Sequence, residues 1–157
     1  MSRCQPGFVL PQGEKDPRLA TFPLALRINR CTASGERLTI RLGPDEWLLI
    51  GPEADTEAMA GEIAAALADR FHALVDISHR NVAFEVSGPQ AEAILNAGCP
   101  LDLHSSSFPA GSGTRTLLGK AEIVLLRPSE EPLFRVECWR SFATYVHGFL
   151  QEAARDV

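Results

Sequence analysis

Apolar residues recur at every second position in several short stretches, which is the pattern of strands with one buried face. These stretches are Leu24–Ile28, Leu38–Leu42, Ala73–Ile77, Val82–Val86 and Phe134–Cys138. Residues Trp47–Ile50 are apolar at every position and predict a short strand buried on both faces. Further strands are expected at Thr116–Leu118 and Ile123–Leu126, because Gly119-Lys120 between them suits a two-residue hairpin turn.

Three stretches show helical periodicity instead. Asp55–Arg70 is rich in Ala, with apolar side chains at every fourth position: Met59, Ile63 and Leu67. A second helix is expected to start at Gly88-Pro89, with an inner face of Ala91, Ile94 and Leu95. The last helix is expected to start near Ser141 as N-cap, and its predicted inner face is Phe142, Tyr145, Val146, Phe149 and Leu150.

The order of these elements predicts the fold class. The middle of the chain runs strand, helix, strand, strand, helix, strand, with Ser78-His79-Arg80 as the expected hairpin between the central strands. This is the order of a ferredoxin-like βαββαβ core. We therefore expect an α+β fold in which further antiparallel strands and a C-terminal helix extend that core. Residues 1–20 are expected to form an irregular arm, and residues 21–157 one domain or two closely packed halves.

Composition excludes several classes of protein. The chain of 157 residues is 45% hydrophobic and 22% charged, which is ordinary for a globular protein. Its net charge of −5 argues against nucleic acid as a partner. No stretch is apolar enough for a membrane span or a signal peptide, and the four cysteines (Cys4, Cys31, Cys99, Cys138) are widely spaced. A cytoplasmic protein with reduced thiols and no membrane association is expected.

Four catalytic or binding motifs can be tested against the sequence, and each fails. Gly111-Ser112-Gly113 lacks the third glycine of a dinucleotide loop and precedes a strand, and Gly113–Lys120 has the wrong spacing for a phosphate loop. Asp76, Ser78 and His79 are too close along the chain to form a catalytic triad.

The fourth motif is Cys99 with His104, a candidate metal-binding pair with Cys138 or His147 as candidate further ligands. It lacks the tight second pair of ligands that metal sites usually have. The sequence therefore predicts no catalytic, cofactor-binding or metal-binding residue on this chain.

One surface feature points to a protein partner. If Phe134, Val136 and Cys138 face the core, Trp139 faces outward together with Arg135 and Glu137. Exposed Trp beside Arg is typical of protein interfaces. The alternative is that the N-terminal arm of the same chain covers Trp139. For Arg80 and Arg140 the choice is also open between a carboxylate on a partner and one within this chain.

Three groups of motifs follow one another along the chain. The first is LGPDEWLLIG at Leu42–Gly51 with VDISHR at Val75–Arg80, and the second is GCPLDLHSSSF at Gly98–Phe108, leading into Thr114–Ala121. The third is FRVECWRSFATYVHGFL at Phe134–Leu150. Together they resemble the gamma subunit family of heterotetrameric sarcosine oxidases over residues 38–150. Within the second motif, Gly98-Cys99-Pro100 is expected to end a helix, and Asp102 and His104 to hold the loop through hydrogen bonds to its backbone.

This resemblance implies a function. It implies a non-catalytic subunit, with alpha, beta and delta subunits as partners, in a complex that oxidatively demethylates sarcosine to glycine and hydrogen peroxide. The one-carbon unit passes to tetrahydrofolate, and FAD, FMN, NAD and the folate are held by the larger alpha and beta subunits. A weaker similarity links the GPDEWLLI, VDIS and Gly-Pro helix motifs to folate-binding aminomethyltransferases, including the glycine-cleavage T-protein. The alternative function is therefore a stand-alone folate or one-carbon binding module.

Overall fold

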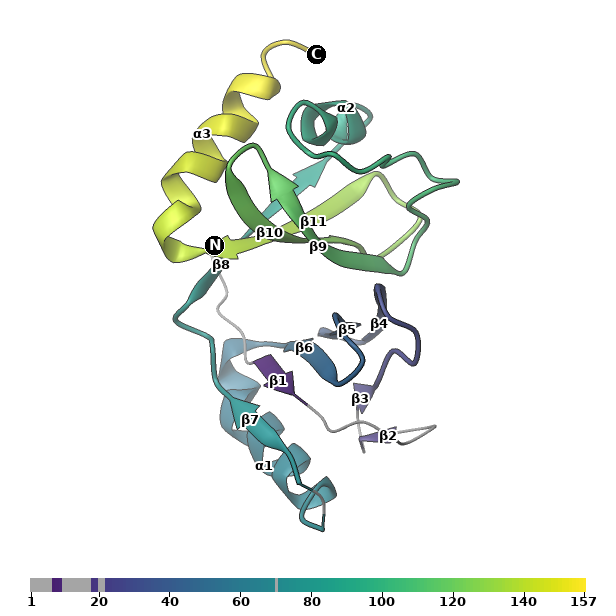
Figure 1. The fold of residues 1–157 in the computed structure, drawn as a ribbon, viewed down its shortest axis with the longest axis vertical. Helices are drawn as coiled ribbons and strands as arrows, with labels where there is room; N and C mark the ends of the chain where they lie inside the picture. Colours follow the sequence, from purple (N-terminus) through teal and green to yellow (C-terminus); the bar gives the residue numbers. More distant parts are fainter. Residues whose placement is uncertain (1–6, 10–17, 20–21, 70) are drawn as a thin grey trace. The chain divides into compact units, whose positions relative to one another are not determined.

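The structure is a computed structural model that describes residues 7–9, 18–19, 22–69 and 71–157. The chain divides into two compact units, with the boundary between His79 and Arg80 (Figure 1). Each unit combines antiparallel strands with helix, so the chain is a mixed α/β protein that ends in a helix. No helix in the described ranges has the length and hydropathy needed to cross a bilayer.

The first unit is built on antiparallel strands in the order β7-β1-β6-β5-β4. Their bounds are β1 Gly7–Val9, β4 Arg30–Ser34, β5 Arg37–Arg41, β6 Glu46–Ile50 and β7 Ala73–Val75. A separate two-stranded sheet pairs β2, Arg18–Leu19, with β3, Phe22–Pro23. A short 3-10 turn at Glu53–Asp55 leads into helix α1, Thr56–Ala66.

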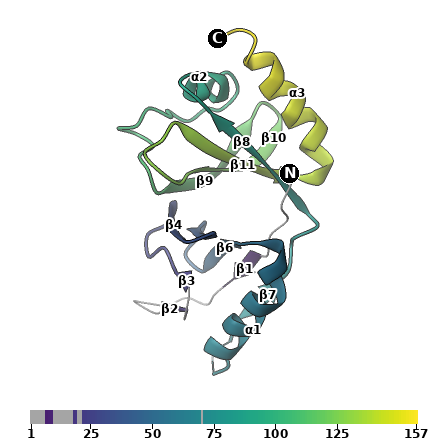
Figure 2. The same cartoon turned by 180° about the vertical axis from the view of Figure 1, so that it is seen from behind.

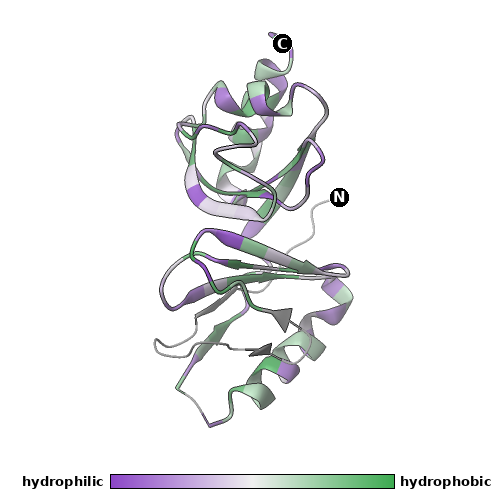
Figure 3. Ribbon diagram, turned by 90° about the vertical axis from the view of Figure 1, so that its right-hand side faces the viewer, coloured by the Kyte–Doolittle hydropathy of each residue, from purple (hydrophilic) through white to green (hydrophobic). Residues whose placement is uncertain are grey.

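Helix α1 packs on one face of this sheet because its apolar residues recur once per turn. Met59, Ile63 and Leu67 are buried, as the sequence predicts. They form a core with alternate residues of β6, Trp47 and Leu49, which point to the same side of the strand. Figure 3 shows the mainly hydrophobic colouring of α1.

The second unit has antiparallel strands in the order β9-β10-β11-β8 and two helices. Their bounds are β8 Asn81–Ser87, α2 Ala91–Asn96, β9 Ser112–Leu118, β10 Ala121–Arg127, β11 Leu133–Trp139 and α3 Ala143–Ala153. A 3-10 turn at Arg140–Phe142 precedes α3. Both helices lie on the same side of the strands in the front and rear views (Figures 1 and 2).

One core joins the strands and helices of the second unit. The predicted inner residues of β11 are fully buried in it: Phe134, Val136 and Cys138. Leu95 of α2 and Val146 of α3 close the core from the helical side. The predicted hairpin is confirmed, since Leu118 pairs with Ala121 across Gly119-Lys120. Gly119 has φ +58°, the positive angle that the first residue of a type II′ turn requires.

The ferredoxin-like core is not confirmed. The element order is as expected, but the pairing differs: β7 pairs with β1, and β8 pairs with β11. The expected hairpin between β7 and β8 is therefore wrong. The sequence pattern identifies strands but carries no information on which distant strand each one joins. The expected division into an arm at residues 1–20 and one domain or two closely packed halves at residues 21–157 stays a prediction, although β1 forms within the expected arm.

Four local expectations are also wrong. Leu24–Ile28, expected as a strand, lies between β3 and β4 and belongs to neither. Gly7–Val9, expected in an irregular arm, forms β1 between β6 and β7. In β7 the core-facing residue is Leu74, whereas Val75 is exposed, so the expected alternation has the opposite phase. Helix α3 begins at Ala143 with Phe142 as N-cap and without a side-chain cap, because a 3-10 turn takes up Ser141. These errors fall near the chain terminus, in short or edge strands and at the start of a helix. At such places the contacts with neighbouring segments decide the secondary structure.

Candidate functional site

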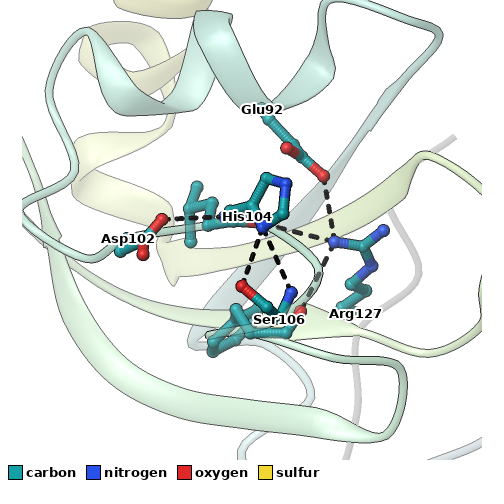
Figure 4. A network of polar contacts seen from close by, with 7 residues as sticks. Glu92, Asp102, His104, Ser106 and Arg127 are labelled. Atoms are coloured by element: carbon teal, nitrogen blue, oxygen red, sulfur yellow. Dashed lines mark hydrogen bonds and ion pairs between the residues drawn. The ribbon is translucent and has the colours of Figure 1, made fainter.

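Side chains that could carry a function lie together at two places in the second unit. The first is the Arg127 cluster, formed by Glu92, the loop Asp102–Phe108 and Arg127 (Figure 4). The second is the Trp139 surface, formed by Arg80, Lys120, Trp139, Phe142 and Tyr145. The sequence singled out the loop, Arg80 and Trp139, but not Glu92 or Arg127.

Arg127 is a buried cation at the end of β10, with 4% of its surface exposed. Its Nη1 donates to Oε1 of Glu92 at 3.0 Å, to the Leu103 carbonyl at 3.3 Å and to the Phe108 carbonyl at 3.4 Å. Its Cζ lies 5.3 Å from the centre of the Phe134 ring. A charge in such a place must be paired and hydrogen-bonded to be tolerated. The residue thereby ties α2 and the irregular loop to the sheet.

The loop above Arg127 is held by its own polar side chains, as the sequence predicts. Asp102 accepts the His104 N–H at 3.0 Å and the Ser107 hydroxyl at 2.6 Å. His104 Nδ1 lies 2.8 Å from Ser106 Oγ and accepts the Ser106 N–H at 3.3 Å. The Ser107 hydroxyl, followed by the His104 N–H, holds the pKa of Asp102 below its ordinary value. These bonds let a segment without regular structure keep one conformation.

The proximity of Asp102, His104 and Ser106 does not make a catalytic triad. In a Ser–His–Asp triad the carboxylate bonds the imidazole and stabilises the imidazolium that forms. Here Asp102 bonds the backbone N–H of His104 and not its ring (Figure 4). The remaining pair, Ser106 and His104, lacks a carboxylate to orient the imidazole ring.

The residues considered for a metal site make other contacts. Cys99 Sγ lies 3.9 Å from Thr116 Oγ1, and the His147 ring lies 5.9 Å from the Phe84 ring, tilted by 31°. Burial raises the pKa of the Cys138 thiol to about 11, which disfavours the thiolate that a metal needs. No group of three or more His, Cys, Asp or Glu residues suited to a metal occurs within the ranges that the structure describes.

The glycine-rich segment does not fit the pyrophosphate of a flavin or nicotinamide cofactor. The Gly111 N–H donates to the Arg127 carbonyl at 2.8 Å, and the Ser112 N–H to the Pro109 carbonyl at 3.1 Å. These are the donors that a phosphate would need. The segment continues into β9, so no helix N-terminus follows it.

The hairpin tip between β9 and β10 is locked against α2 and α3. The Gly119 N–H donates to the Gly98 carbonyl at 2.9 Å, and the Lys120 N–H donates to Tyr145 Oη at 3.1 Å. A Cβ atom on Gly98 would collide with the ring of Phe149 and lie 3.0 Å from the Gly119 nitrogen. Glycine is thus needed at Gly98 for close packing. The expectation that a helix ends here is confirmed, since α2 ends at Asn96.

The Trp139 surface is open to solvent. Trp139 is 44% exposed, and Arg80 stacks on its ring with Cζ 5.0 Å from the centroid. Phe142 and Tyr145 are also exposed, although the sequence placed both on the inner face of the last helix. That face is narrower than expected, with Val146 and Leu150 buried and Phe149 partly buried. The expectation that Trp139 faces outward is confirmed.

The expectation that Glu137 shares the exposure of Trp139 is wrong. Glu137 is only 3% exposed, and Arg135 Nε donates to its Oε1 at 2.7 Å. Burial raises the pKa of Glu137, and the positive charge of Arg135 opposes that rise. Alternation along a strand predicts the face on which a residue lies, but not what covers that face.

Together these features define a mixed α/β protein in which a buried cation orders a loop, with aromatic side chains exposed at the N-terminal end of the last helix. The chain belongs to the sarcosine oxidase gamma subunit family, whose model matches residues 19–156.

Curated relatives carry the same family description. The gamma subunits of sarcosine oxidase from Arthrobacter sp. and from Corynebacterium sp. strain P-1 are each 38% identical to the chain over 90 residues, 57% of this chain and 43% of theirs. That from Corynebacterium sp. strain U-96 is 31% identical over 115 residues, 73% of this chain and 55% of its own. The chain thus matches about half the length of these relatives.

A solved structure shares the fold. It is a chain of the heterotetrameric sarcosine oxidase from Corynebacterium sp. U-96, in complex with pyrrole 2-carboxylate, with a TM-score of 0.87 and 24% identity. The match covers 98% of this chain and 80% of that one. The fold of this chain therefore recurs in a chain of a heterotetrameric complex.

Proposed function

We propose that the chain is the gamma subunit of a heterotetrameric sarcosine oxidase and supports the assembly of the catalytic chains. Membership of the gamma subunit family over residues 19–156 is the observation that carries this proposal. The fold shared with a chain of the Corynebacterium heterotetramer supports it. The partners are the alpha, beta and delta subunits, and the complex acts in the cytoplasm.

In this proposal the chemistry belongs to the other chains. The complex oxidatively demethylates sarcosine to glycine with hydrogen peroxide and passes the one-carbon unit to tetrahydrofolate. FAD, FMN, NAD and the folate are held by the larger subunits. The contacts of the gamma chain support this division of labour, because Arg127, Asp102 and the Gly111 N–H all bond groups of their own chain.

Co-expression tests the proposal. A tagged gamma chain is produced with the alpha, beta and delta subunits of the same organism, and the captured chains are identified by mass spectrometry. We expect an equimolar yellow complex that oxidises sarcosine, while the isolated gamma chain is colourless and inactive. Sarcosine-dependent oxygen consumption by the isolated chain would contradict the proposal.

A folate titration separates the proposal from the binding-module alternative. Isothermal calorimetry of the isolated chain with tetrahydrofolate is expected to give no saturable heat. Tight one-to-one binding would favour a one-carbon binding module instead. The intact complex serves as the positive control, because its larger subunits are expected to bind the folate.

A further inference from the structure

Arg80 differs from the other arginines of the chain whose contacts are defined. Arg37 pairs with Asp55 and Glu62, and Arg127 pairs with Glu92. Arg80 instead contacts the Trp139 ring and, within the described part of the chain, makes no side-chain hydrogen bond or ion pair. An exposed guanidinium is thus held in place without using its hydrogen-bond donors.

Stacking prepares Arg80 for a carboxylate. A guanidinium that lies over an aromatic ring uses its flat face, while its N–H groups point outward in the plane. Those donors match a carboxylate in a two-pronged contact. Because Trp139 already restricts the side chain, less conformational entropy is lost when the contact forms.

The neighbouring side chains add apolar area and a second positive charge. Phe142 and Tyr145 are exposed and one helical turn apart, so they lie on the same side of the chain. Lys120 is anchored beside Tyr145 through its backbone N–H. Residues 139–149 include no Asp or Glu, although the whole chain carries a net charge of −5. Arg80 and Lys120 thus provide two positive charges, and Glu122 of β10 adds one negative charge, since the pairing of Ile123 with Cys138 places Glu122 opposite Trp139.

We propose that the Trp139 surface binds a segment of another subunit that presents Asp or Glu beside an apolar side chain. Arg80 takes the carboxylate, the three aromatic side chains take the apolar neighbour, and Lys120 attracts acidic groups at the edge. The inference rests on the proposed function, since it assumes a partner within the complex. Trp, Tyr and Arg are the residues that most often dominate the affinity of an interface. Charge complementarity selects an acidic partner over a second copy of the same surface.

Cross-linking with a carbodiimide tests which group meets Arg80. The reagent joins an amine directly to a carboxylate, and Lys15 and Lys120 are the only lysines of the chain. R80K keeps the charge and adds one reactive amine at the proposed contact. In the assembled complex, we expect a new cross-link from position 80 to an Asp or Glu of the alpha, beta or delta subunit. R27K, at an exposed position of the first unit, is the control and is expected to lack it.

Affinity measurements test the same surface without a cross-linking reagent. R80E and W139A are each expected to weaken binding to the other subunits at least roughly tenfold. R27E and F71A, at exposed sites of the first unit, are the matched controls, with changes within about twofold, the ordinary effect of residues outside an interface hot spot. Phe71 suits this purpose because it is 94% exposed. Circular dichroism verifies that each variant is folded.

The outcomes separate the two proposals. If the wild-type chain fails to join the other subunits, the proposed function is wrong. If it joins them and R80E and W139A bind equally well, only the Trp139 surface is wrong as a docking site. A cross-link from R80K to a second copy of this chain would also overturn the inference and identify a self-association surface.

Discussion

The second unit contains two arginine–aromatic pairs of similar geometry and opposite surroundings. Arg127 lies 5.3 Å from the Phe134 ring, and Arg80 lies 5.0 Å from the Trp139 ring. Arg127 is enclosed and donates to Glu92 and to loop carbonyls. Arg80 is exposed, and Trp139 beside it remains 44% exposed. The comparison shows that burial, and not the type of contact, separates a residue that orders the fold from one open to a partner.

The physical reason lies in desolvation. A buried guanidinium loses its bound water. The stability of the folded protein then depends on the protein acceptors that replace this water. An exposed guanidinium keeps its water and loses it only when a partner binds. Substitutions at Arg127 should therefore affect folding, and substitutions at Arg80 or Trp139 should affect association. The following variants test this division, in order of decreasing effect.

R127A should give the largest loss of stability. It removes the donor for Glu92 and two backbone carbonyls and leaves a gap beside Phe134. We expect the free energy of unfolding to fall by about 3 kcal/mol, measured by urea denaturation. R155A, which removes an exposed helical pair with Glu152, is the control and should cost less than about 0.5 kcal/mol. Equal effects of both variants would show that the Arg127 cluster does not order the fold.

G98A should follow, with a loss of about 2 kcal/mol, because the added methyl group meets the Phe149 ring and the Gly119 backbone. The matched control is G148A, whose added Cβ meets nothing within 4 Å. Since Gly148 lies inside α3, that change should stabilise the protein by about 0.5–1 kcal/mol. Thermal unfolding of both variants measures the difference. If G98A stabilised the protein as G148A does, the tight packing at Gly98 would be refuted.

E137Q should change how stability depends on pH. Burial raises the pKa of Glu137 in the folded state, against the opposing charge of Arg135. Such a group favours folding below its unfolded pKa, and this contribution is lost as pH rises through the folded pKa. The stability of E137Q relative to wild type should therefore rise as the pH increases above the ordinary pKa of Glu, about 4. Urea titrations of E137Q and wild type over this pH range measure the difference.

W139A should have the smallest effect on the isolated chain. It removes one exposed cation–π contact, so the free energy of unfolding should fall by less than about 1 kcal/mol. The same variant is expected to weaken assembly strongly. A loss of several kcal/mol in urea denaturation would instead mean that Trp139 supports the fold, and the contrast with Arg127 would disappear.

The sequence predicts local structure well where the structure depends only on residues within the same helix, strand or turn. The stripe of Met59, Ile63 and Leu67, the inner face of β11 and the Gly119-Lys120 hairpin all follow the sequence. The loop bonds of Asp102 were also predicted, because Asp side chains bond the backbone two residues onward in such turns. Family membership agrees with the resemblance read from the motifs.

What depends on distant partners could not be predicted. The Arg127 cluster was missed because Glu92 and Arg127 are 35 residues apart and meet only after α2 packs on the sheet. The exposure of Phe142 and Tyr145 was missed because an apolar pattern shows which residues could be buried, and not whether a neighbour covers them.

The sequence by itself determined the helices, most of the strands and the outward position of Trp139, since these depend on side-chain period and turn chemistry within a few residues. Only the tertiary structure decided which strands pair, that Glu137 is buried while Trp139 is not, and that Arg127 orders the loop. Pairing and burial are relations between segments far apart in the chain, and they are settled when those segments exclude water together.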